Sequence, residues 1–177
     1  VNEIIKQSGS SITIGESGDT VDLSNPTSVT LNSDMKNAPA FQAYRTATQS
    51  ISNSTFTKVQ NNVVLFDTDS AYDNSTNYRF TIPSGKAGKY VFGVSVNIHD
   101  LTDTSYAHAL VYKNGSKLKE NIVSASRTIP TSVHTITIDD ASDGDYYEAY
   151  TKQVSGGSLD LNYIYGNVFY GYRIIGA

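Results

Sequence analysis

The stretch AGKYVFGVSVNI, residues 87–98, alternates between two kinds of side chain. From Tyr90 to Ile98 every even position is aromatic or aliphatic, whereas the odd positions from Lys89 to Asn97 are mostly small or polar. Successive side chains of a β-strand point to opposite faces, so this period of two predicts a half-buried strand. One face is expected to pack on a core and the other to meet solvent or a partner. Such a strand is typical of the centre of a β-sandwich.

The composition favours an all-β protein. Of 177 residues only 17% are charged, and 13 Tyr and 6 Phe accompany abundant Ser, Thr and Asn. Aromatic, β-branched and hydroxyl side chains favour strands and the loops that join them. No segment shows the 3.6-residue period of an amphipathic helix. A chain of this length has room for one sandwich domain and a small appendage.

Charge and residue content argue against several classes of protein. The net charge is −4 and the 13 basic residues are scattered, whereas a nucleic-acid surface needs clustered Lys and Arg. The chain has no Cys, which excludes disulfides and Cys-ligated metals, so stability must come from packing or assembly. No apolar run reaches the length of a membrane span, and we expect no membrane insertion.

Residues 39–177 predict a succession of short strands with clear turns between them. Asn114-Gly115 is a hairpin signal, and the glycines at 144, 156 and 157 mark further turns. Ten strands at near-regular spacing predict a ten-stranded sandwich, with a jelly roll favoured. The expected strands are 41–46, 56–60, 63–66, 78–82, 89–98, 106–113, 117–123, 133–138, 146–153 and 164–175.

Residues 1–38 differ from the rest and are expected to form a separate stem or anchoring segment. Short apolar pairs recur between polar turns, at 12 and 14, 21 and 23, and 29 and 31. Each pair is too small to bury a core alone, so an ordered segment would have to share its core with other copies, as a threefold β-stem does. The alternative is a disordered polar arm. Asp34 to Pro39 form the expected hinge before the head.

The residues from 40 onward resemble a known family in order along the chain. The segments that carry the resemblance are AFQAYR at 40–45, TFTKV at 55–59, FDT at 66–68, YDNST at 72–76, FTIP at 80–83, GKYVF at 88–92, KNGS at 113–116, GDYYE at 144–148 and FYGYRI at 169–174. Together they resemble the globular head of the C1q/TNF-like superfamily. The resemblance covers residues 40–177 and implies a jelly-roll head that assembles as a homotrimer and binds other molecules.

Two departures from the family pattern bear on function. The turn at residues 83–87 is about two residues longer than usual, and no collagen-like repeat precedes the head. The polar stem, the hinge at Pro39 and this head together resemble bacteriophage fibre, spike or capsid-decoration proteins. The expected function is therefore that of a virion structural protein at the virion surface. It would join another virion protein through residues 1–38 and bind a host-surface glycan or protein. The alternative is an extracellular or spore-surface C1q-like protein of a cellular organism.

The last predicted strand indicates oligomerisation without reference to any family. It is apolar on both faces, and a strand apolar on both faces is buried on both. One face can pack in its own sandwich, whereas the other requires a partner subunit or a long covering loop of the same chain. The predicted trimer interface consists of Tyr163, Tyr165, Val168, Tyr170, Tyr172 and Ile174.

We expect no enzyme activity, no catalytic residue and no cofactor. The chain lacks Cys and a Gly-x-Ser-x-Gly elbow, and His99, His108 and His134 are far apart in the sequence. A glycosidase needs two carboxylates flanking a cleft, and no pair stands out from the aspartates of the turns.

Four aspartates in one predicted loop form a candidate metal site. Hard carboxylate oxygens bind Ca²⁺, although the spacing here is not that of an EF-hand. Aspartates that hydrogen-bond the backbone of their own turn are the competing interpretation. The candidate calcium ligands are Asp139, Asp140, Asp143 and Asp145.

Overall fold

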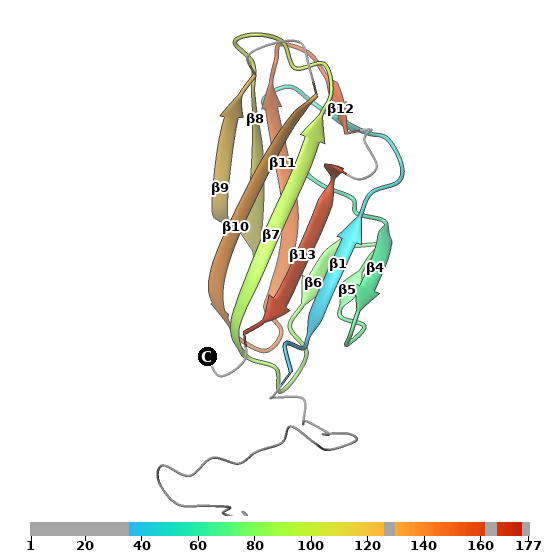
Figure 1. Ribbon diagram of the computed structural model, residues 1–177, viewed down its shortest axis with the longest axis vertical. Coiled ribbons are helices and arrows are strands. Elements are labelled where there is room, and N and C mark those ends of the chain that lie inside the picture. The colour runs from blue at the N-terminus through green and yellow to red at the C-terminus, as the bar shows by residue number, and fades with distance from the viewer. Residues whose placement is uncertain (1–35, 126–129, 162–165, 175–177) are drawn as a thin grey trace, which may run out of the picture. The chain divides into compact units, whose positions relative to one another are not determined.

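The computed structural model describes residues 36–125, 130–161 and 166–174 (Figure 1). Residues 1–35 of the expected stem lie outside this part of the chain. Within the described ranges, no helix is long and apolar enough to cross a membrane.

The described residues contain all ten expected strands, together with three short strands that were not expected. The three additional strands, β2, β5 and β12, are two or three residues long. The strands are β1 (Ala40–Tyr44), β2 (Gln49–Ile51), β3 (Thr57–Lys58), β4 (Val63–Asp67), β5 (Tyr72–Asp73), β6 (Arg79–Thr81), β7 (Gly88–Ile98), β8 (Tyr106–Lys113), β9 (Ser116–Ser124), β10 (Thr131–Ala141), β11 (Tyr146–Val154), β12 (Leu159–Leu161) and β13 (Val168–Arg173).

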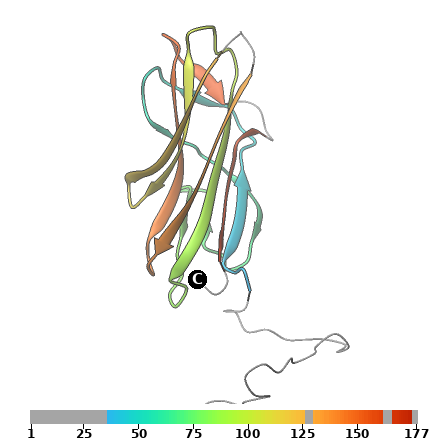
Figure 2. The same ribbon diagram turned by 60° about the vertical axis from the view of Figure 1, so that its left-hand side comes forward.

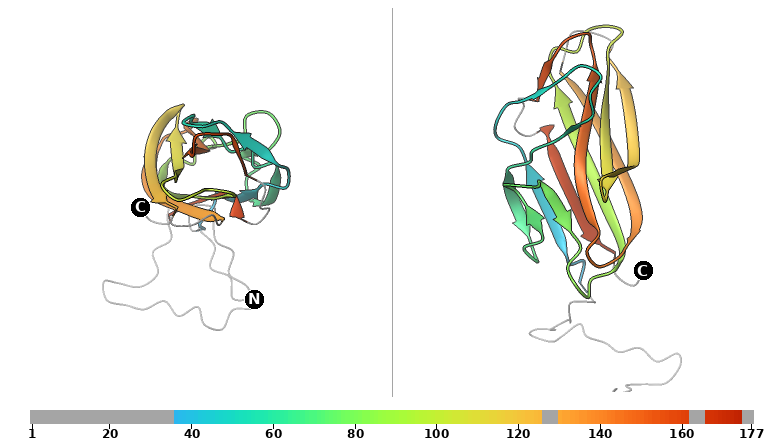
Figure 3. Two further views of the ribbon diagram at one scale, coloured as in Figure 1. Left: turned by 90° about the horizontal axis from the view of Figure 1, so that it is seen from above. Right: turned by 180° about the vertical axis from the view of Figure 1, so that it is seen from behind.

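The strands form a two-layered sandwich. The first sheet has the order β10-β7-β13-β1-β4, and the second has the order β5-β6-β11-β8-β9, with β3 beside β11. A third, two-stranded sheet joins β12 to β2. Figure 1 looks onto the first sheet, the right panel of Figure 3 looks onto the second, and Figure 2 shows the two layers side by side. The all-β jelly-roll sandwich expected from the sequence is confirmed.

The alternating strand β7 lies near the centre of the first sheet, between β10 and β13. Its even-numbered side chains from Tyr90 to Ile98 are 0–2% exposed and face the second sheet. Full burial of one such aliphatic or aromatic side chain contributes about 1.5–3 kcal/mol. The prediction that this face packs on the core is confirmed.

Aromatic rings from both sheets pack against one another in the core. Phe41 of β1 stacks on Phe80 of β6 at 4.4 Å between ring centroids, and Phe92 of β7 stacks on Tyr147 of β11 at 3.8 Å. Gly171 of β13 makes this packing possible, because a Cβ there would lie 2.6 Å from the Phe92 ring. The core therefore links the two sheets through aromatic contacts, and it fixes which face of each strand points outward.

Candidate interaction surface

Strand β13 lies in the middle of the first sheet, between β7 and β1. Phe169 and Gly171 point into the sandwich and are buried. Val168 and Tyr170 point the other way and are half-buried, and Tyr172 is 39% exposed. The structure thus confirms that one face of this strand packs in its own sandwich. It also leaves the opposite, apolar face uncovered by the described residues.

The register extends this outward face across the whole sheet. Residues paired across antiparallel strands share a face, so three rows of side chains lie beside one another. We call these rows, with the adjoining Leu65, the β13 face. The rows are Ile138, Val91, Tyr172 and Ala40; Ile136, Gly93, Tyr170, Gln42 and Phe66; and His134, Ser95, Val168, Tyr44 and Val63.

Exposed apolar side chains are concentrated on the β13 face. Among the described residues, seven large hydrophobic side chains are exposed, and five of them lie here. The five are Leu65 at 62%, Phe66 at 46%, Ile136 at 57%, Ile138 at 63% and Tyr172 at 39%. Single exposed hydrophobics are ordinary on a protein surface, but a contiguous group marks a site of interaction.

The β13 face also carries shallow depressions. The first, of about 370 Å³, lies between Phe66, Tyr170 and Tyr172. The second, of about 220 Å³, lies between Tyr170 and Ile136, and the third, of about 190 Å³, lies beside Leu65. A flat apolar surface with shallow hollows suits another protein surface better than a small molecule, which usually occupies a deeper, more enclosed pocket.

The ring of Tyr170 lies directly on the backbone of β7. A Cβ built on Gly93 would lie 2.1 Å from Cζ of Tyr170, so no other residue fits at position 93 without displacing the ring. This close approach keeps Tyr170 flat on the sheet and separates the two larger depressions. A glycine inside a strand often marks such an approach of another group to the backbone.

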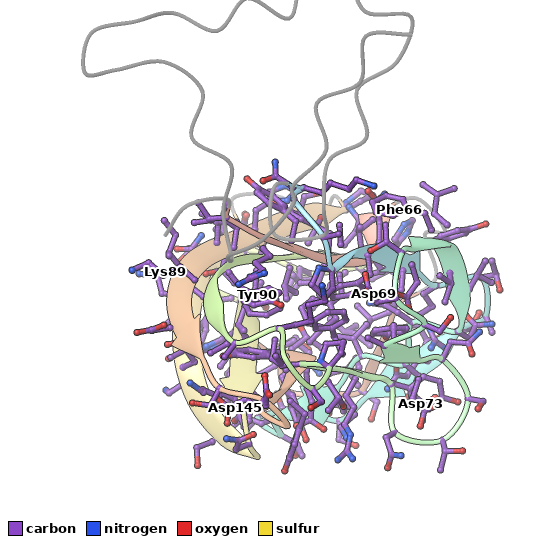
Figure 4. The ribbon with its side chains drawn as sticks, turned by 90° about the horizontal axis from the view of Figure 1, so that it is seen from below. Phe66, Asp69, Asp73, Lys89, Tyr90 and Asp145 are labelled. Atoms are coloured by element: carbon purple, nitrogen blue, oxygen red, sulfur yellow. The ribbon has the colours of Figure 1, made fainter. Side chains whose placement is uncertain are left out.

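Charged groups are sparse on the β13 face. Within its three rows, His134 is the one residue of the Asp, Glu, Lys, Arg and His types. Lys89 pairs in register with Asp140 at one end of the sheet, beyond the rows. Figure 4, seen from below, shows Lys89 and Phe66 at the periphery of the sandwich, whereas the Tyr90 ring points into its interior. Depletion of charge at the centre of an apolar patch is the compositional signature of a protein interface.

The four candidate calcium ligands are engaged with protein donors or exposed. Asp143 accepts hydrogen bonds from the backbone N–H groups of Gly85, Lys86 and Ala87, and these bonds lower the pKa of its carboxyl group. Thus Asp143 supports a turn of another segment, whereas the turn interpretation placed its hydrogen bonds within its own turn. Asp140 is exposed on the surface.

Asp139 and Asp145 share Lys113 of β8. The Lys113 Nζ lies 2.7 Å from Asp139 Oδ2 and 3.0 Å from Asp145 Oδ2. Burial acts to raise the pKa of Asp145, but hydrogen bonds from Asn114, from the Ser142 N–H and from Lys113 outweigh it, and the pKa is lowered. The described residues contain no group of three or more His, Asp, Glu or Cys side chains that could hold a metal ion. Calcium binding stays a prediction from the sequence.

Comparison with known proteins supports the fold. No protein-family model and no curated protein sequence matches this chain. The globular domain of zebrafish complement 1qA protein matches in structure at 18% identity and a TM-score of 0.54, over 77% of this chain and 97% of the other. Eiger TNF from S. frugiperda matches at 11% identity and a TM-score of 0.57, over 78% of this chain and 93% of the other. The described part of the chain has the C1q/TNF-like fold. PRD1 vertex protein P5 also matches, at 16% identity and 0.58, over 76% of this chain and 72% of the other.

The C1q/TNF-like head positions four of the six predicted interface residues on or beside the β13 face. Val168, Tyr170 and Tyr172 belong to its rows. Ile174 follows β13 and is half-exposed, and its N–H donates to the carbonyl of Lys89 at 2.8 Å. The other two, Tyr163 and Tyr165, lie outside the described residues.

Sequence reasoning missed a large part of the β13 face. Leu65 and Phe66 of β4 and Ile136 and Ile138 of β10 were not among the predicted interface residues, although they are its most exposed apolar side chains. An available signal was the pair of isoleucines two residues apart in β10, which share one face of a strand. That signal cannot say whether the shared face is the core or an interface, because both are apolar.

Proposed function

We propose that this protein is a homotrimeric virion structural protein that displays a C1q/TNF-like head. Residues 1–38 would anchor it to another virion protein. The observation that carries the proposal is the β13 face, an apolar and nearly uncharged surface on the central strand of the first sheet. Water is a poor partner for such a surface, so a second copy of the chain is its proposed occupant.

The layout of the apolar side chains suits a ring of three copies. Ile136 and Ile138 lie on β10 at one edge of the sheet, whereas Leu65 and Phe66 lie on β4 at the opposite edge. A cyclic arrangement brings one part of a surface onto a different part of the next copy, and the ring closes without leaving either part exposed. The resemblance of residues 40–177 to the C1q/TNF-like superfamily supports three as the number of copies.

Multivalent binding or stabilisation of the particle is the proposed role. Three weak sites on one trimer bind a repetitive surface with an avidity that exceeds the affinity of each site. The similarity to PRD1 vertex protein P5, together with the sequence resemblance to fibre, spike and decoration proteins, supports a location on a virion. The proposal includes no catalytic step.

An extracellular C1q-like protein of a cellular organism is the second candidate. It is favoured by the similarity to the zebrafish complement 1qA domain, of which 97% is covered. Immunogold electron microscopy with antibody against this chain separates the two candidates. Labelled virions support the virion proposal, and label confined to a cell or spore surface overturns it.

The trimer is tested by multi-angle light scattering of the full chain at micromolar concentration. The expected mass is three times the monomer mass of 19.2 kDa. A monomer mass under these conditions would refute the proposed occupant of the β13 face.

A further inference from the structure

The second sheet carries an unusual set of aromatic side chains on its outer face. Tyr147 and Ala149 of β11 point into the core, so Tyr146, Tyr150 and Lys152 point outward. Tyr150 stacks on Tyr112 of β8, with 4.0 Å between ring centroids. Phe56, which is 40% exposed, lies near Lys152 at the far end of the same strand. We call Phe56, Tyr112, Tyr146 and Tyr150 the aromatic row.

The aromatic row follows strand β11, which the right panel of Figure 3 shows near the middle of the second sheet. Tyr146 and Lys152 are six residues apart, so at about 3.3 Å per residue the row extends over about 20 Å. The depressions described above lie on the other sheet. The row is thus a long, flat surface with several rings, which suits an extended ligand with repeated units better than one compact molecule.

Each exposed part of the row has a cation beside it. The Arg79 guanidinium lies 4.3 Å from the centre of the Tyr146 ring, and Lys58 Nζ lies 6.0 Å from that of Tyr150. At Phe56, Lys152 Nζ lies 4.9 Å from the ring centre. Lys117 Nζ approaches the same ring to 5.6 Å. Cations over aromatic faces hold both groups in place and keep positive charge at the surface.

Two of these four cations have no carboxylate partner among the described residues. Lys58 pairs with Glu148 at 2.5 Å, and Lys117 pairs with Glu120 at 2.7 Å. Lys152 and Arg79 form no ion pair with any described residue. Lys152 therefore leaves an unpaired positive charge beside the Phe56 ring, on a protein whose net charge is −4. An exposed ring with an unpaired ammonium group beside it can recognise a ligand that combines an apolar surface with a negative charge.

We infer that the aromatic row binds an acidic polysaccharide, with sugar rings on its aromatic side chains and a carboxylate on Lys152. The C–H face of a pyranose ring is apolar and packs on an aromatic ring, while its hydroxyl groups stay in water or bond the tyrosine hydroxyls. A polymer of uronic acid repeats this ring face and its carboxylate along its length. Along the row, Arg79 lies beside Tyr146 and Lys152 lies beside Phe56, so a ring with an unpaired cation is found at each end.

Other polyanions fit the row less well. A nucleic acid presents a phosphate at every unit and needs clustered free cations, whereas Lys58 and Lys117, two of the four cations along the row, are paired with glutamates. An acidic peptide supplies charge but no regularly repeated ring face for the aromatic side chains. The combination of rings with few free charges favours a sugar polymer of moderate charge.

The expected avidity for a polymer rests on the proposed function, because it requires three copies of the chain, whereas the binding site itself lies within one chain. The aromatic row lies on the second sheet, and the β13 face lies on the far side of the first. A trimer assembled through the β13 face therefore leaves three aromatic rows accessible, and weak contacts at each would add up on a polymer.

The test is affinity electrophoresis and biolayer interferometry of the full chain with polygalacturonate. Dextran serves as a neutral sugar polymer, poly-L-glutamate as an acidic polymer without sugar rings, and oligo-dT as a nucleic acid. Phe56→Ala and Lys152→Gln are each expected to weaken binding about tenfold, since each removes a contact at all three sites of a trimer. Lys119→Gln is the matched control: Lys119 is exposed on the same sheet, but its register partner Val111 lies in the core, so it points away from the row.

Selective binding of polygalacturonate that is weakened by both variants, and not by Lys119→Gln, establishes the site. Equal binding of poly-L-glutamate or oligo-dT overturns the sugar specificity, and equal binding of dextran overturns the role of charge. No binding of any polymer overturns the inference. Light scattering of the same samples keeps the two proposals apart. A trimer that does not bind refutes this site alone, whereas a monomer that binds refutes the trimer alone.

Discussion

Placing a charge on the β13 face, in the row next to that of Tyr170, is expected to dissociate the proposed trimer. Tyr172 is 39% exposed in the single chain, so Tyr172→Asp puts its carboxylate in water as long as the chain is alone. In the trimer the same carboxylate would be buried without a partner. Loss of the remaining apolar contact removes about 1 kcal/mol per chain. Burial of an unpaired carboxylate costs several kcal/mol more.

These penalties arise three times in each trimer, and each 1.4 kcal/mol changes an equilibrium constant about tenfold. A trimer that persists at micromolar concentration should therefore become monomeric. Light scattering measures the mass, and far-ultraviolet circular dichroism shows whether the chain is still folded. Phe56→Asp is the matched control, because Phe56 is 40% exposed but lies beside the second sheet, next to Lys152 of β11. That variant is expected to remain trimeric.

Two outcomes would refute the reasoning. A folded Tyr172→Asp protein that stays trimeric shows that the β13 face is not the interface. Dissociation of both variants to the same extent shows that the aromatic row is buried by assembly, and the second sheet would then be part of the contact.

Three further predictions concern the fold, its response to pH and its segments. Gly93→Ala is expected to destabilise the head by about 1–3 kcal/mol because the new methyl group displaces the Tyr170 ring. Gly157→Ala is the control, since a Cβ at residue 157 would have no atom within 4 Å. Equal melting temperatures of the two variants would contradict the predicted clash with Tyr170. Backbone hydrogen bonds hold the pKa of the Asp143 carboxyl group below its usual 3.8. The ionised carboxylate therefore contributes fully to the stability of the head above pH 3.8, and this contribution is lost as the pH falls through the lowered pKa. Asp143→Asn should therefore lower the melting temperature at neutral pH more than in acid, and an equal or larger effect in acid would refute this. A chain truncated to residues 38–177 is expected to stay a soluble trimer and to fail to join its particle; if it is monomeric while the full chain is trimeric, the stem drives assembly.

Strand β7 shows why much of the fold was predictable. Its alternation from Tyr90 to Ile98 is a local property, and a strand with one apolar face has few ways to bury it. Strand β10 was predicted more narrowly, as 133–138, but runs from Thr131 to Ala141. It pairs with β7 over its full length, from Thr131 opposite Ile98 to Ala141 opposite Gly88. Pairing with β7 extends β10 beyond the predicted residues, and the sequence of β10 alone does not show that β7 is its neighbour.

The same strand shows where pattern reasoning fails. His134, Ile136 and Ile138 alternate with Val133 and the threonines between them, and the isoleucines alone would assign their face to the core. The structure instead buries Val133, while both isoleucines are more than half exposed. Pairing with β7 sets the register, and a residue opposite an outward-facing partner also faces outward. The register with β7 therefore decides which face of β10 is buried in the core and which face stays exposed.

The sequence by itself determined the all-β class, the presence of the ten predicted strands and the apolar character of both faces of β13, because each depends on short-range alternation and turn chemistry. Only the tertiary structure decided which residues share a face. Tyr170 over Gly93, Phe66 beside Gln42, and Phe56 beside Lys117 come from strands far apart in the chain. Their proximity is set by strand order and register, which result from the joint packing of two sheets around one core. No local segment contains that information, so the β13 face and the aromatic row become visible only when the chain is folded.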